Sequence, residues 1–108
     1  MYLLGYNFAM YKVKKTDNFS KWHSSLKDLK AKLSVARRID RMSQGNFGDS
    51  EPIGHGASEA RIDIGPGYRF YYMVQNKEII ILLLGGDKST QQKDINKAKE
   101  MAKEYKNA

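Results

Sequence analysis

Hydrophobic side chains recur every three or four positions across residues 18–44, which is the pattern of amphipathic helices. The first apolar stripe contains Phe19, Trp22, Leu26, Leu29 and Leu33, and the second contains Val35, Ile39 and Met42. Asp17 or Asn18 can cap the first helix, because either side chain can accept hydrogen bonds from free N–H groups. Ser34 marks either a second cap or a bend, and Gly45 ends the region. A helical hairpin is therefore predicted across residues 18–44.

In the second half of the chain the pattern changes to period two, which indicates strands. Residues 59–64 and residues 68–74 alternate between apolar and polar positions on either side of the turn Gly65-Pro66-Gly67. Ile79–Leu84 is an unbroken apolar run, which is typical of a strand that is buried on both faces. Three strands joined by short turns predict an antiparallel meander.

The remaining segments complete the expected fold. A short first strand is predicted at residues 11–15, and residues 45–58 are rich in Gly, Ser, Asp and Pro and are predicted to form a loop. Ser89 or Thr90 is expected to cap a final helix. The predicted order is β-α-α-β-β-β-α. This is an α+β fold in which an antiparallel sheet packs against the N-terminal helical hairpin and a C-terminal helix.

Size and composition limit the class of protein. With 108 residues the chain is expected to form one domain, and the absence of cysteine fits a reducing cytoplasm. No apolar run reaches the roughly 18 residues of a membrane helix, and residues 1–9 lack the basic start of a signal peptide. Met10 is an alternative start. The domain is therefore placed at residues 10–108, with residues 1–9 as either an upstream extension or an additional strand.

The charge balance favours polyanionic partners. Lys and Arg total 19 against 12 Asp and Glu, which gives a formal net charge of +7. Nucleic acid, the ribosome, an anionic membrane or an acidic protein would all fit this charge. Arg37, Arg38 and Arg41 are expected to form a basic face on the second predicted helix. That face fits a solvated surface, an acidic partner or ribosomal RNA equally well.

A cluster of candidate functional residues follows from strand parity. If the strands on either side of the Gly65-Pro66-Gly67 turn pair, Arg61 and Arg69 emerge on one face with Tyr71 beside them. Lys88, in the loop after the apolar strand, can complete the cluster. Two guanidinium groups and an ammonium group suit a phosphate, and a phenol can stack on a base. Such a set can support RNA cleavage by a 2′-hydroxyl group, because arginines stabilise the charge of the transition state. The simpler interpretation is a basic sheet face that binds a partner.

His55 is the other candidate acid or base. It lies between two glycines, Gly54 and Gly56, and close in sequence to the cluster. With no second histidine nearby, an exposed surface residue is the simpler interpretation. The acidic residues are scattered and there is no His/Cys cluster, so neither a metal site nor a cofactor is expected.

Several sequence motifs resemble the addiction-module killer proteins of the RelE/ParE superfamily, which are close to the HigB-type toxins. The similar runs are Gly56–Asp63, Gly65–Arg69, Leu83–Gln91 and Lys93–Ile95, and the likeness extends over nearly everything from Met10 onward. Ala60 departs from the family, which usually has Leu there. We expect this difference to affect packing rather than chemistry.

The resemblance implies a RelE-like fold and the toxin of a type II toxin–antitoxin system in the bacterial cytoplasm. A helix-turn-helix antitoxin would neutralise the toxin, and contact with operator DNA would occur only through that antitoxin. RelE-like relatives cut mRNA in the ribosomal A site with Arg, Lys and Tyr. ParE-like relatives instead inhibit DNA gyrase, and a third alternative is an inactive toxin that is retained for its antitoxin complex. No membrane partner is implied.

The resemblance also assigns roles by position. Arg69 matches the arginine that follows the tight turn in such enzymes, and Lys88 matches the basic residue after the last long strand. The catalytic candidates are Arg61, Arg69, Lys88 and Tyr71. The RNA-binding candidates are Arg37, Arg38, Arg41 and His55.

Overall fold

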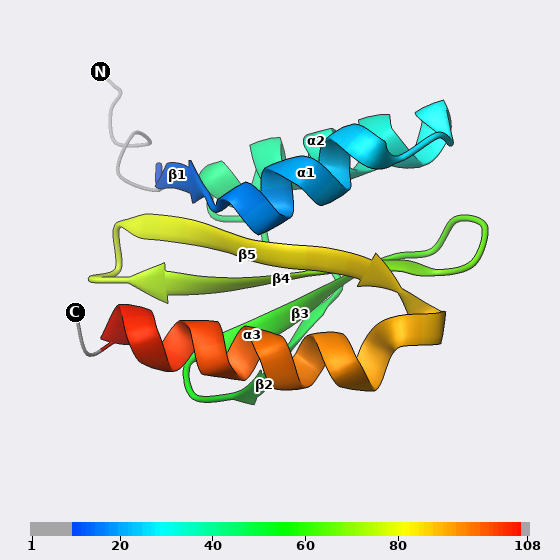
Figure 1. The fold of residues 1–108 in the computed structure, drawn as a ribbon. Coiled ribbons are helices and arrows are strands. Elements are labelled where there is room, and N and C mark those ends of the chain that lie inside the picture. The colour runs from blue at the N-terminus through cyan, green and yellow to red at the C-terminus, as the bar shows by residue number, and fades with distance from the viewer. Residues whose placement is uncertain (1–9, 107–108) are drawn as a thin grey trace, which may run out of the picture.

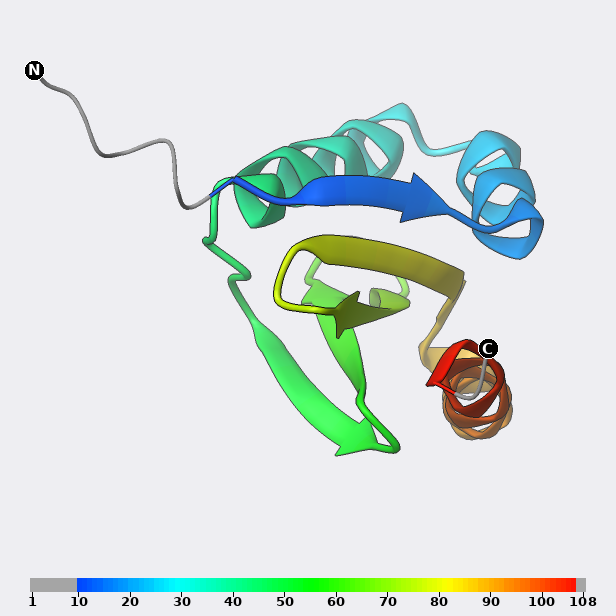
Figure 2. The same cartoon turned by 90° about the vertical axis from the view of Figure 1, so that its left-hand side faces the viewer.

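The computed structural model describes residues 10–106 and has an α+β fold, in which a sheet is covered by helices on both faces (Figures 1 and 2). The elements in chain order are β1 (Lys12–Lys15), α1 (Asp17–Ser25), α2 (Leu29–Ser43), β2 (Ser50–Gly54), β3 (Ala57–Ile62), β4 (Tyr68–Gln75), β5 (Ile79–Asp87), the short 3₁₀ turn η2 (Lys88–Thr90) and α3 (Gln91–Lys106). The extension expected at residues 1–9 lies outside the described residues. Between residues 10 and 106, no helix is long and apolar enough to span a bilayer.

The five strands form a mixed sheet within the described range, in the order β1-β5-β4-β3-β2. The meander of β3, β4 and β5 is antiparallel, as the sequence predicts. β1 is different, because it pairs parallel with β5 and places Lys12 opposite Ile79. The prediction of a wholly antiparallel sheet is therefore wrong. A parallel neighbour requires a long crossover, and the chain between β1 and β5 provides it.

The predicted loop at residues 45–58 contains a further strand, β2, which pairs antiparallel with β3. Its pattern is hard to recognise because Glu51, Pro52 and Gly54 are exposed and only Ile53 is half-buried among its apolar positions. β2 lies at the edge of the sheet, where a proline is tolerated because one side of the strand needs no hydrogen-bonded neighbour. A one-sided edge strand lacks the alternation that reveals a half-buried strand.

The N-terminal caps of α1 and α2 differ from the sequence prediction. Thr16 caps α1, since its hydroxyl oxygen accepts a hydrogen bond of 3.0 Å from the Phe19 backbone N–H. The chain then turns to an extended conformation at Leu26, and Asp28 caps α2 through a 3.2 Å hydrogen bond from the Ala31 N–H. Ser34 lies inside α2. The second helix is thus capped six residues earlier than the sequence pattern suggests, at Asp28 and not at Ser34.

Two apolar cores lie on opposite faces of the sheet. One packs α1 and α2 against the sheet and includes Phe19, Val35, Met42, Ala60, Ile62, Phe70, Tyr72, Ile80 and Leu82. The other packs α3 against the opposite face and includes Ala57, Tyr71, Met73, Ile81, Leu83, Leu84, Ala98 and Ala102. Because β5 contributes to both cores, the sequence prediction that its apolar run is buried on both faces is confirmed.

Two adjacent glycines let β5 pass between the helical layers. Gly85 lies directly against the indole ring of Trp22 in α1, and a side-chain carbon at this position would overlap that ring. Gly86 lies against the carboxylate of Asp94 in α3, again without room for a side-chain carbon. Consecutive residues of a strand point to opposite faces, so this pair allows close approach of a helix on each side.

Candidate functional site

The predicted pairing of Arg61 with Arg69 is present. The two residues lie directly opposite each other on β3 and β4, and the next pair on the same face is Glu59 with Tyr71. The placement of Arg61, Arg69 and Tyr71 on one face is therefore confirmed. It is the face that α3 covers, and Glu59 adds an acidic group to the predicted cluster.

Glu59 is the centre of this cluster, and its side chain is only 1% exposed. One carboxylate oxygen, Oε2, accepts hydrogen bonds from the Tyr71 hydroxyl at 2.9 Å and from the Gln91 amide at 3.0 Å. The other oxygen, Oε1, accepts a 3.1 Å hydrogen bond from Arg61 Nη1. Arg69 Nε lies 3.7 Å from Oε2, which is close enough for an ion pair but too long for a hydrogen bond. Both arginines therefore contact one buried carboxylate.

Arg61 is part of a wider ion-pair network. Its Nη1 donates to Glu51 at 2.9 Å and its Nη2 donates to Asp49 at 3.3 Å, in addition to the contact with Glu59. The hydrogen bonds to Glu51 and Asp49 raise the pKa of the Arg61 guanidinium group above its usual value. Arg61 is thus a fixed cation whose charge is compensated by three neighbouring carboxylates, and this compensation limits its attraction for a further anion.

Arg69 and Lys88 both lie near Gly67 in the β3–β4 turn. Arg69 is 14% exposed, and its Nη1 donates a 3.0 Å hydrogen bond to the carbonyl oxygen of Gly67 in the β3–β4 turn. The exposed Lys88 has its Cβ 3.9 Å from the position that a Gly67 side-chain carbon would take. A cavity of about 150 Å³ beside this turn is lined by Asp49, Arg61, Ile62, Asp63, Gly67, Tyr68 and Arg69. The cluster therefore assembles at one end of the sheet.

Tyr71 is fully buried, with an exposed fraction of 0%. The predicted role as a platform for a nucleobase does not agree with this burial, because its ring packs in the core beneath α3. Burial and the hydrogen bond to Glu59 both raise the pKa of the Tyr71 phenol well above its usual value. Tyr71 is therefore a neutral hydrogen-bond donor to Glu59 and not a proton acceptor at neutral pH.

Tyr71 is expected to stay protonated when the pH is raised past about 10, where exposed tyrosines ionise. A raised pKa favours the protonated folded state, so this contribution to stability is complete below about pH 10 and is lost as the pH rises further. Phenolate absorbance should be followed between about pH 9 and pH 12 for the wild type and Tyr71→Phe. Both folded proteins should form equal numbers of phenolates. An additional phenolate in the folded wild type would contradict the assignment.

Arg38 does not belong to an exposed basic face, contrary to the sequence prediction. Its side chain is buried and donates hydrogen bonds to the backbone carbonyl oxygens of Asp49 at 3.2 Å and Arg61 at 2.9 Å. Burial, followed by repulsion from Arg41, lowers its pKa. Arg38 thus ties α2 to the segment before β2 and to the end of β3, whereas Arg37 and Arg41 are exposed.

His55 is not brought to the cluster. It lies in the exposed turn between β2 and β3 with a φ of 54°, at the end of β3 that is farthest from Arg61. The side chains of Lys99, in the middle of α3, and Lys106, at its end, approach the glycines on either side of it. His55 is close to Arg61 in sequence but distant in space, because the length of β3 separates the two residues. Within the described part of the chain, no group of three potential metal ligands occurs.

Comparison with known proteins shows a relative of similar length. No family model matches the chain. A Haemophilus influenzae protein named "uncharacterized protein" is 51% identical over 92 residues, which cover 85% of this chain and 93% of the relative. Identity at this level over nearly the whole of both proteins shows common descent. The chain therefore belongs to the same family as this Haemophilus influenzae protein.

Proposed function

We propose that this protein is the toxin of a type II toxin–antitoxin system, with a RelE-like fold, and that it cleaves mRNA on the ribosome in the cytoplasm. The segments that resemble RelE/ParE toxins support the proposal, since β3, β4, the end of β5 and the start of α3 are neighbours in the structure. The net charge of +7 is suited to a polyanionic substrate. A helix-turn-helix antitoxin would be the regulatory partner.

The observation that carries the proposal is the pairing of Arg61 with Arg69 beside a cavity that both arginines line, with Lys88 next to Gly67 of the same β3–β4 turn. Guanidinium groups bind phosphate oxygens through paired N–H donors, and a lysine adds a mobile positive charge. These are the groups that transition-state stabilisation requires at a phosphate.

The contacts divide the catalytic roles among these residues. Arg69 and Lys88 would bind the scissile phosphate, because they have fewer acidic neighbours than Arg61. Arg61 would hold the Glu59 carboxylate, which in turn orients Arg69. Glu59 already accepts hydrogen bonds on both oxygens and Tyr71 is protonated, so Lys88 would assist proton transfer.

Arg69→Ala is expected to abolish growth arrest when the gene is induced without its antitoxin.

Lys88→Ala, at an exposed position, should reduce mRNA cleavage by about 100-fold with no change in folding, because a stabilising charge is lost at the transition state. The matched control is Lys97→Ala, an exposed lysine of α3. The measurement is growth together with mapping of new mRNA 5′ ends within codons. Full toxicity of a folded Arg69→Ala protein would exclude this role for Arg69.

Inhibition of DNA gyrase is a second candidate function, and the compensated charge of Arg61 favours it. A binding toxin needs neither an accessible tyrosine nor a free cationic centre, and Tyr71 is buried. In the same induction experiment, a DNA-damage response without new mRNA 5′ ends would support gyrase inhibition. No growth defect would support an inactive toxin that is retained for its antitoxin complex.

A further inference from the structure

The outward face of α2 carries an exposed apolar row. Leu29 is 68% exposed and Leu33 is 47% exposed. With Ala36 they recur at spacings of four and three, on the side of the helix opposite the buried residues Ala31 and Val35. From Leu29 to Arg41 this face extends about 18 Å, at 1.5 Å per residue.

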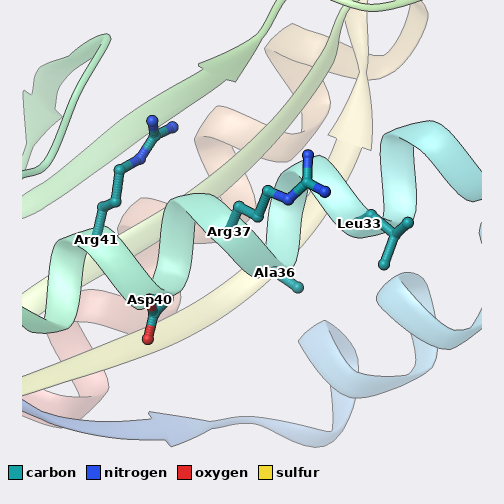
Figure 3. Close-up of a pocket in the computed structure, with 5 residues that line it drawn as sticks. All are labelled: Leu33, Ala36, Arg37, Asp40 and Arg41. Carbon is teal, nitrogen blue, oxygen red and sulfur yellow. The ribbon is translucent and has the colours of Figure 1, made fainter.

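A cationic row lies next to the apolar row. Arg37 and Arg41 extend from the same side of α2, whereas Asp40 extends from the other side (Figure 3). Together with Leu33 and Ala36 these residues line an open depression of about 430 Å³. It lies on the outer surface of α2, on the opposite side of the sheet from α3 and the Glu59 cluster.

The charges of this face have no partner of their own within residues 10–106. In that range the side chains of Arg37, Asp40 and Arg41 make no ion pair and no hydrogen bond, and only the backbone carbonyl of Asp40 accepts a hydrogen bond from the Ser43 hydroxyl. Arg61 and Arg69, in contrast, both contact Glu59. Among residues 10–106, the exposed arginines without a carboxylate partner are therefore Arg37 and Arg41, which lie beside the exposed leucines.

We propose that this face of α2 binds an acidic polypeptide segment that carries leucine-like side chains. Carboxylates of the partner would meet Arg37 and Arg41, and its apolar side chains would cover Leu29 and Leu33. RNA would satisfy the arginines but would leave the leucines against water or phosphate, so a protein segment fits the composition better. The inference does not depend on the proposed function, because it uses only the outer face of α2.

The test is selection of a randomised helical peptide, displayed on phage, with the purified full-length chain. The selected sequences should share two Asp or Glu residues three or four positions apart, next to Leu, Ile or Met. The synthesised consensus peptide should bind at least about tenfold more weakly to Arg37→Glu/Arg41→Glu and to Leu29→Ser/Leu33→Ser, and equally well to Lys97→Ala. A peptide whose acidic residues are replaced by lysine should regain affinity for Arg37→Glu/Arg41→Glu.

This charge exchange separates recognition from damage to the fold, and circular dichroism should show an unchanged melting temperature for each exposed variant. Failure to select any peptide, selection of peptides without acidic residues, or equal binding to all variants would overturn the proposal. Loss of mixed-sequence RNA binding in Arg37→Glu/Arg41→Glu, with peptide binding retained, would instead assign the face to RNA.

Discussion

Glu59→Ala is expected to lower the free energy of unfolding by about 3–5 kcal/mol. The substitution removes the acceptor of the Tyr71 hydroxyl and leaves the positive charge of Arg69 at a site that is only 14% exposed. A buried charge without a partner costs much more than the loss of an exposed ion pair. Urea denaturation, monitored by circular dichroism, measures the decrease in the free energy of unfolding directly.

Glu51→Ala is the matched control for this prediction. It removes a carboxylate from the same network, where Glu51 accepts a 2.9 Å contact from Arg61, but its side chain is 60% exposed. The free energy of unfolding of Glu51→Ala should fall by less than about 1 kcal/mol, because exposed ion pairs are screened by water. If the two variants are equally stable, the contacts of Glu59 contribute no more than a surface ion pair and our description of the cluster is wrong.

Gly85→Ala should destabilise the protein by about 3 kcal/mol through overpacking. Its methyl group would overlap the indole ring of Trp22. The ring has little freedom to move, since it packs against Phe19 with a centroid separation of 5.6 Å. The melting temperature in a calorimetric scan should fall by several degrees.

A double-mutant cycle identifies the cause of this loss. In a Trp22→Ala background the same glycine substitution should cost less than about 1 kcal/mol, since the overlapping ring is absent. If Gly85→Ala destabilises the Trp22→Ala protein as much as the wild type, the strain arises in the backbone of β5 and not from contact with α1.

The long elements of the fold could be predicted because their patterns arise from burial. The apolar run in β5 and the alternation in β3 and β4 reflect one or two covered faces, and the structure has these strands in the expected order. The start of α2 could not be placed correctly. Leu29 and Leu33 continue the stripe of α1 in sequence, but the Asp28 cap begins a new helix and turns both leucines outward. Periodicity alone does not distinguish a buried apolar row from an exposed one.

The candidate site could be predicted only in part, for a similar reason. Strand parity places Arg61 opposite Arg69, but the same parity also places Glu59 beside them, and this signal was present in the sequence. The contact with Gln91 could not be foreseen, because it depends on how α3 packs across the sheet from 32 positions away. Sequence patterns show which side chains share a face and not which elements cover that face.

The parallel pairing of β1 with β5 determines when this chain can complete its fold. Thr16, which follows β1, donates a hydrogen bond to the carbonyl oxygen of Leu83, 67 positions later. During synthesis, α1 and α2 leave the ribosome before the strand that their apolar sides cover. Contacts this distant in sequence slow folding, because a large loop must close before they form. The pairing of β1, and the core that α1 and α2 form against the sheet, can therefore be completed only after β5 has been made.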